Sequence, residues 1–173
     1  MRWLPFQLNP DLPEGGIPRE EYVARKFGAR GKGVNERVAM AGRQVGIPFA
    51  YEKMKVQPNT LNAHRLMHYA GRTGKQDELA EELFRAHFTE GANLTDKETL
   101  ADIAGRAGLD RKAVAAYLAS DEDRGLIGQR ENEARSAGIG GVPFFIFNRK
   151  IGVSGAQDPD ALLDAMEQAL TEG

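Results

Sequence analysis

The sequence contains no cysteine among its 173 residues. Disulfide bonds, thiolate metal sites and cysteine nucleophiles are therefore excluded within this chain. No apolar run approaches the roughly 20 residues that a membrane-spanning helix needs, and the N-terminus does not have the pattern of a signal peptide. An excess of positive charge is also lacking, because 23 Lys and Arg stand against 25 Asp and Glu. We therefore expect no nucleic-acid or membrane partner and a cytoplasmic location.

Apolar residues make up 41% of the chain and charged residues 28%, a balance typical of a globular domain with a real core. Residues 2–8 mix bulky apolar and polar side chains before a Pro/Gly loop, which predicts a short strand. From residue 58 to residue 137 the apolar spacing is helical throughout. Within this block the pair Thr95 and Glu98 predicts a capping box, and Asp110 is predicted to cap the following helix.

The pattern changes at the C-terminal end. The run "PFFIF" predicts a buried strand, "NRK" a turn and "IGV" the returning strand of a hairpin. A last amphipathic helix follows, with Asp158 as its cap and Pro159 at its first position. The order of elements predicts an α/β fold with one mixed sheet of three short strands and a helical insertion.

The pair Val142-Pro143 precedes the predicted strand directly, and proline is the residue at which a cis peptide bond is least costly. A turn of this kind would expose the backbone N–H and C=O of Val142, which could then pair with an extended peptide. An ordinary trans proline at the start of a strand is the more frequent alternative, since only about 5–6% of X-Pro bonds in folded proteins are cis.

The string "GVPFFIFNRKIGVSGAQDPDALLDAM" resembles the C-terminal end of the DsbA-like, thioredoxin-fold family, in particular its FrnE subgroup. The strings "RWLPFQLNPDLP", "PNTLNAHRL" and "LFRAHFTEG" resemble other signatures of that subgroup, in the same order. The 2-hydroxychromene-2-carboxylate isomerases and the kappa-class glutathione transferases are neighbouring branches. The resemblance implies an incomplete thioredoxin-like domain, residues 1–57 and 138–173, interrupted by a helical insertion, residues 58–137.

The resemblance also implies what this sequence does not contain. Family members begin with a strand and a Cys-Pro-x-Cys turn at a helix N-terminus, where the helix dipole lowers the pKa of the first cysteine. We therefore expect the chain to start at the family's second strand and to lack the central strand and the nucleophile. As given, it is expected to be inactive in thiol–disulfide exchange, and no catalytic residue is assigned.

Residues of a substrate-binding site follow from the same resemblance. Pro143 falls on the family's cis-proline, and Val142 falls on the residue whose backbone meets substrate. Gln157 lies near the loop that holds glutathione in the transferases. Asn59 and His64 resemble the part of the insertion that faces the active site, although His64 could equally be a helix residue with a local hydrogen bond.

Three functions stay open at this point. The first is a DsbA/FrnE-type thiol–disulfide oxidoreductase that acts on thiol or disulfide proteins. The second is a glutathione-dependent isomerase or transferase, in which glutathione would be a co-substrate and no other cofactor is expected. The third is a non-catalytic thioredoxin-like interaction protein, for which unpaired strand edges predict a homodimer.

A metal site is a further alternative. His64 and His68 are four residues apart on one predicted helix, and His87 on the next helix completes the 3 histidines of the chain. This spacing could suit zinc, but spacing alone does not bring three ligands together. We therefore assign no metal ligand.

Overall fold

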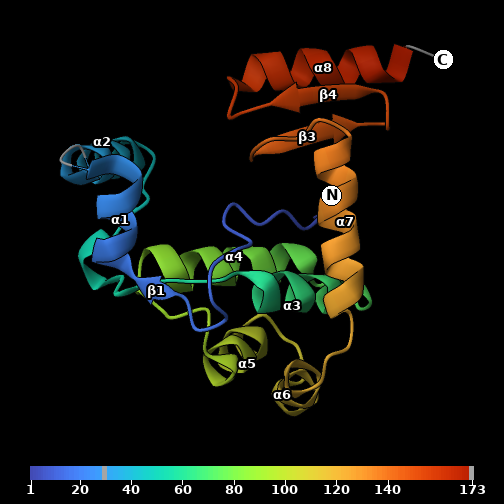
Figure 1. Ribbon diagram of the computed structural model, residues 1–173. Helices are drawn as coiled ribbons and strands as arrows, with labels where there is room; N and C mark the ends of the chain where they lie inside the picture. Colours follow the sequence, from blue (N-terminus) through green and yellow to red (C-terminus); the bar gives the residue numbers. More distant parts are fainter. Residues whose placement is uncertain (29–30, 172–173) are drawn as a thin grey trace. The chain divides into compact units, whose positions relative to one another are not determined.

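The computed structural model describes residues 1–28 and 31–171 (Figure 1). The chain divides into two compact units, unit 1 with residues Met1–Gly128 and unit 2 with residues Gln129–Gly173. The architecture is mixed α/β and rich in helices, as the sequence predicts. The domain boundaries implied by the resemblance stay a prediction. None of the described helices combines the length and the hydropathy that crossing a bilayer requires.

The described part of the chain forms α-helices, one short 3-10 helix and four strands. The helices are α1 (Arg19–Phe27), α2 (Gly31–Gln44), η2 (Tyr51–Lys53), α3 (Leu61–Gly71), α4 (Gln76–Phe88), α5 (Lys97–Arg106), α6 (Arg111–Ala119), α7 (Arg124–Ser136) and α8 (Pro159–Thr171). The strands are β1 (Ile17–Pro18), β2 (Val56–Gln57), β3 (Phe144–Phe147) and β4 (Ile151–Ser154).

Helices α3 to α6 build the core of unit 1. Figure 1 shows α3 and α4 running side by side, and α5 and α6 pack against this pair. Apolar residues at helical spacing supply the fully buried side chains, as the sequence predicts for this block. Four of them are Leu66, Leu79, Leu100 and Leu118. Burying a leucine side chain of this kind contributes about 2 kcal/mol, so these helices are the stable part of the unit.

Carboxylate caps begin two of these helices. Asp110 accepts hydrogen bonds from the N–H groups of Lys112 and Ala113 at the start of α6, which confirms its predicted capping role. The predicted Thr95 cap of α5 is wrong, because Asp96 takes this place and accepts from the N–H of Thr99 at 2.9 Å. A carboxylate is a stronger acceptor for these N–H groups than a hydroxyl.

The strand predicted at residues 2–8 is also wrong, because the described segment pairs with no other strand. Instead, the side-chain amide of Gln76 binds the backbone of Trp3 on both sides. The N–H of Trp3 donates to Oε1 of Gln76 at 3.2 Å, and Nε2 of Gln76 donates to the carbonyl of Trp3 at 3.3 Å. The Trp3 indole N–H donates to Asp77 at 2.6 Å. A side chain of α4 therefore satisfies backbone groups for which a strand would need a sheet.

The predicted mixed sheet of three strands is wrong as well. The described strands form two separate antiparallel pairs, β1 with β2 and β3 with β4. The first pair joins Ile17 to Gln57 and Pro18 to Val56. Strands of two residues carry too little periodic pattern to be found in a sequence.

Gly91 gives a direct test of packing in unit 1. Its φ is +76°, and a Cβ added there would lie 2.7 Å from the backbone carbon and oxygen of Lys53. We expect the Gly91→Ala variant to lose at least about 1–2 kcal/mol of unfolding free energy, because left-handed strain adds to a backbone clash. Urea unfolding measures this. Gly74 has a similar φ of +70° and open space around it, so Gly74→Ala isolates the strain alone.

Unit 2 contains the predicted hairpin and C-terminal helix. Strands β3 and β4 pair from Phe144 with Ser154 to Phe147 with Ile151, which confirms the hairpin. Its turn places Asn148 at a φ of 50°, and Nδ2 of Asn148 donates to the carbonyl of Ala169 in α8 at 3.1 Å. Helix α8 therefore packs on the hairpin. Its exposed side includes three large apolar residues, Leu163, Met166 and Leu170.

Candidate functional site

Val142 and Pro143 lie at the end of the segment that leads into β3. The peptide bond between them is cis, as the resemblance implies. Val142 is 49% exposed, and Pro143 is exposed as well. The carbonyl of Pro143 accepts a hydrogen bond from the N–H of Gly155 at 2.9 Å. Within residues 1–28 and 31–171, the backbone N–H and C=O of Val142 have no hydrogen-bond partner.

One edge of β3 is open among the described residues. The carbonyls of Pro143 and Phe147 face β4, because they accept from Gly155 and Lys150 at 2.9 Å each. In an antiparallel pair, alternate residues turn both backbone groups to the same side. The backbone groups of Phe144 and Ile146 therefore point away from β4, and those of Val142, just before the strand, are also without a partner among the described residues. Together these residues offer a row of donors and acceptors to an incoming strand.

The loop from Ser154 to Gln157 lies beside this turn. The hydrogen bond from the N–H of Gly155 to the carbonyl of Pro143 joins the loop to the turn, two residues before Gln157. The side chain of Gln157 folds back, and its Nε2 donates to the carbonyl of Ser154 at 2.8 Å. The role of Gln157 in ligand binding stays a prediction.

Asn59 and His64 belong to unit 1, at the beginning of α3. Nδ2 of Asn59 donates to the carbonyl of Leu12 at 2.7 Å, and its Oδ1 accepts from the N–H of Leu61 at 3.0 Å. Both ends of this amide therefore have structural partners, one in the N-terminal loop and one in the first turn of α3. The substrate-binding role predicted for Asn59 stays untested.

His64 lies beneath the N-terminal segment. Burial lowers its pKa from the ordinary 6.5 to about 4, although a hydrogen bond with the backbone of Phe6 opposes the shift. The imidazole is therefore neutral at pH 7. The hydrogen bond joins His64 to a segment far away in the sequence, so it is not the local bond considered as the alternative, and the role of His64 towards substrate stays a prediction.

A pH titration tests the burial of His64. Its folded pKa lies below its unfolded pKa, so the neutral form stabilises the fold fully above pH 6.5. This contribution is lost as the pH falls towards 4, because the unfolded chain takes up the proton first. We expect stability to fall by up to about 3 kcal/mol across this window. Urea unfolding at a series of pH values measures the fall.

The His64→Gln variant should remove most of this dependence. His87 is the matched control, because burial also lowers its pKa, and His87→Gln should leave the larger part of the dependence in place. Arg124 lowers the pKa of Glu14, so this carboxyl makes the stability depend on pH only below its ordinary pKa of 4.5. An unchanged pH profile in His64→Gln would contradict the burial of this imidazole.

The histidines do not form a metal site in the part of the chain that the structure describes. His68 lies on α3 with Nε2 3.8 Å from Oδ2 of Asp123. His87 is buried in α4, and its Nδ1 lies 3.2 Å from the carbonyl of Ala92. No group of three His, Cys, Asp or Glu side chains in residues 1–28 and 31–171 could hold a metal ion.

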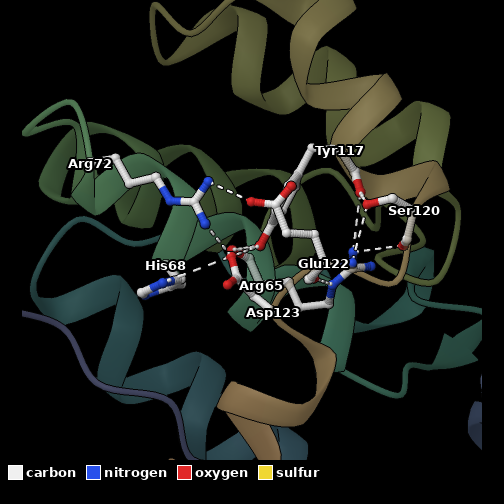
Figure 2. Close-up of polar contacts among 7 residues, drawn as sticks. All are labelled: Arg65, His68, Arg72, Tyr117, Ser120, Glu122 and Asp123. Carbon is white, nitrogen blue, oxygen red and sulfur yellow. Dashed lines mark hydrogen bonds and ion pairs between the residues drawn. The ribbon is translucent and has the colours of Figure 1, made fainter.

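The sequence does not reveal a buried polar cluster around Arg65 (Figure 2). This arginine is fully buried in α3 and donates four hydrogen bonds to neutral acceptors. Nε donates to the carbonyl of Glu122 at 2.8 Å and Nη1 to Oδ1 of Asn62 at 2.9 Å. Nη2 donates to the carbonyls of Tyr117 and Ser120 at 3.1 and 2.8 Å. The guanidinium therefore ties the end of α6 to α3.

Asp123 forms the other half of this cluster. It has a φ of 63°, and its Oδ2 accepts from Arg72 at 2.5 Å and from the hydroxyl of Tyr117 at 2.8 Å. Burial and the hydrogen bond to Asp123 raise the pKa of Tyr117, so its phenol stays protonated. Figure 2 shows these side chains converging between α3 and the chain that enters α7. The cluster anchors the end of α6 and the turn before α7 to α3.

The turn, its flanking loop and the α/β architecture match a known family. The sequence model of the DSBA-like thioredoxin domain matches residues 1–167. The chain belongs to the DSBA-like thioredoxin domain family. This membership confirms the resemblance to the DsbA-like family found in the sequence. The FrnE subgroup stays a prediction.

A solved structure supports the same conclusion. A probable DsbA oxidoreductase from Streptomyces coelicolor is similar to this DSBA-like chain, with 28% sequence identity and a TM-score of 0.87. The match covers 97% of this chain and 74% of that chain. Among curated proteins, none matches the sequence.

Proposed function

We propose that this DSBA-like chain binds extended polypeptides at the Val142–Pro143 turn, as the substrate-binding part of a thiol–disulfide oxidoreductase. One observation carries the proposal. The backbone N–H and C=O of Val142 are without partners among the described residues and continue into the open edge of β3. An extended peptide satisfies such groups by adding a strand, and the exposed side chains of Val142 and Ile146 favour apolar substrate residues.

The exchange step itself needs a sulfur that this chain does not supply. A thiolate attacks one sulfur of a substrate disulfide, forms a mixed disulfide and releases the other sulfur as a thiolate. With no cysteine among 173 residues, the chain alone is expected to bind substrate without exchanging disulfides. Insulin reduction by dithiothreitol should proceed at the background rate when purified chain is added. Turnover above background would contradict this part of the proposal.

Binding is testable without any thiol chemistry. The probe is a fluorescein-labelled insulin B chain whose cysteines are carboxymethylated, so that only non-covalent contacts contribute. Fluorescence anisotropy should rise to saturation as the chain is added, and unlabelled B chain should compete. If the anisotropy stays flat while circular dichroism shows a folded chain, the proposal is wrong.

The loop beside the turn favours a second function. Gly155 donates to Pro143, so the Ser154–Gln157 loop contacts the turn, and the resemblance to glutathione transferases implies a glutathione site near this loop. A glutathione-dependent isomerase or transferase takes its thiol from the ligand and needs no cysteine. Isothermal titration with glutathione distinguishes the two functions. Heat of binding that Gln157→Ala removes would support this alternative, and its absence at millimolar ligand would exclude it.

We also propose a homodimer, on the open edge of β3. The strand Phe144–Phe147 has no charged residue and no proline within it, which are the usual means of blocking edge-to-edge pairing. Light scattering should then give a mass that rises towards twice 19.0 kDa with concentration. A constant mass of one chain would contradict the dimer without affecting peptide binding.

A further inference from the structure

Arg19 opens α1 in unit 1 and is a half-buried cation. Its Nη1 donates to Oε1 of Gln57 at 2.5 Å, and its guanidinium lies 5.6 Å from the centre of the Tyr51 ring. Its Nε is buried and has no acceptor in the described part of the chain. The guanidinium therefore makes one strong hydrogen bond, to a neutral amide, where five donors are available.

No carboxylate of the described chain neutralises this charge. Burial lowers the pKa of Arg19, and the groups that oppose the shift are the phenols of Tyr51 and Tyr22 rather than an acid. Burial in turn raises the pKa of Tyr51, so this phenol stays neutral and does not act as the counter-ion. Arg72 and Arg124 of the same unit do have carboxylate partners, and the fully buried Arg65 has four neutral acceptors where Arg19 has one. A desolvated charge without a partner is costly, and an external anion would relieve this cost.

Aromatic side chains near Arg19 indicate a second property of a ligand, an apolar ring. Phe49 and Tyr51 stack nearly parallel, with ring centres 5.5 Å apart and an angle of 12°. Phe88 meets Phe49 edge-on at 5.8 Å. All three rings are only partly buried, and the Tyr51 ring lies against the guanidinium. His87 adds no second charge, because burial lowers its pKa and the charge of Arg19 lowers it further.

We infer that Arg19, with the rings of Phe49 and Tyr51, forms a binding site for a small aromatic carboxylate. The carboxylate would accept hydrogen bonds from the Nη donors of Arg19 that Gln57 does not use, and the ring of the ligand would lie against the aromatic side chains. This site is separate from the proposed polypeptide-binding turn and does not rest on that function. All of its residues belong to unit 1.

Phenylacetate and the uncharged phenylacetamide form the first test. Isothermal titration and NMR shifts should show phenylacetate binding to the whole chain at least about tenfold more tightly than phenylacetamide, because a charge-assisted hydrogen bond is lost in the amide. Arg19→Gln should lower the affinity for phenylacetate to that of the amide. Arg25→Gln is the matched control, because Arg25 lies on the same helix and already pairs with Glu21.

Gln57→Glu is the decisive second variant. It places a carboxylate where Nη1 of Arg19 already donates, so the chain supplies its own counter-ion. This variant should melt at a higher temperature than the wild type and lose phenylacetate binding by about tenfold or more. It keeps the inference testable if Arg19→Gln does not fold.

A titration with a peptide distinguishes binding of a small free acid from binding of the C-terminal carboxylate of a polypeptide. Gly-Gly-Phe carries the same ring and carboxylate at a peptide C-terminus, and Gly-Gly-Phe amide lacks the charge. Weaker binding of Gly-Gly-Phe than of phenylacetate supports a small-molecule site, and binding of Gly-Gly-Phe alone overturns it. The inference is also overturned if phenylacetate and phenylacetamide bind equally, or if Gln57→Glu binds phenylacetate as tightly as the wild type.

Discussion

The Arg65→Met variant is expected to lose about 3–5 kcal/mol of unfolding free energy, the largest effect on stability that the structure predicts. The methionine fills much of the same space but removes the guanidinium donor from four buried or half-buried acceptors, of which the Tyr117 carbonyl still accepts from Ser120. Three of these acceptors are backbone carbonyls at the end of α6 and in the turn that follows. Helix ends buried without such partners are unstable.

Urea unfolding of the whole chain measures this loss, and Arg111→Met is the matched control. Arg111 pairs with Glu98 and Asp102, but it is half exposed, so its removal should cost no more than about 1 kcal/mol. Similar losses in the two variants would contradict the anchoring role of Arg65. Because Tyr117 also contacts this guanidinium, fluorescence of the tyrosines can report the same transition.

The Val142→Pro variant is expected to weaken polypeptide binding by about tenfold or more. Proline has no backbone N–H, so the variant removes the donor that an added strand would use and leaves the rest of the β3 edge intact. Anisotropy with the carboxymethylated insulin B chain measures the loss. Val142→Ala is the control, because it keeps the N–H while it shortens the side chain. Equal loss in both variants would show that side-chain contact, and not the backbone, carries binding.

The sequence pattern was sufficient to predict those elements whose hydrogen bonds are made between residues close together in the sequence. The hairpin at residues 144–154 follows from aromatic and β-branched residues on either side of a turn, and Asp110 caps α6 because its carboxylate reaches N–H groups two and three residues ahead. The segment at residues 2–8 failed for the opposite reason. The backbone of Trp3 bonds to the side chain of Gln76, which is 73 residues away in the sequence. A local sequence pattern does not predict such a contact.

In the candidate site, too, some residues could be predicted from the sequence and others could not. The resemblance, and not periodicity, pointed to Val142 and Pro143, since a trans bond was the more frequent expectation for a proline at a strand start. Arg65 was missed because arginine is almost always exposed, and nothing in "AHRLM" shows that four acceptors surround it. Arg19 was missed because the absence of a counter-ion is a property of the folded neighbourhood.

The most direct test of the account is an NMR titration of the 15N-labelled chain with an unlabelled, carboxymethylated insulin B chain. If the peptide adds as a strand at the Val142–Pro143 turn, we expect the amide resonances of Val142, Phe144 and Ile146 to shift together. Their hydrogen exchange should slow at saturation. These residues turn their N–H groups to the open edge of β3. If the peptide binds while these three amides keep their shifts and exchange rates, the substrate-binding role of the Val142–Pro143 turn is wrong.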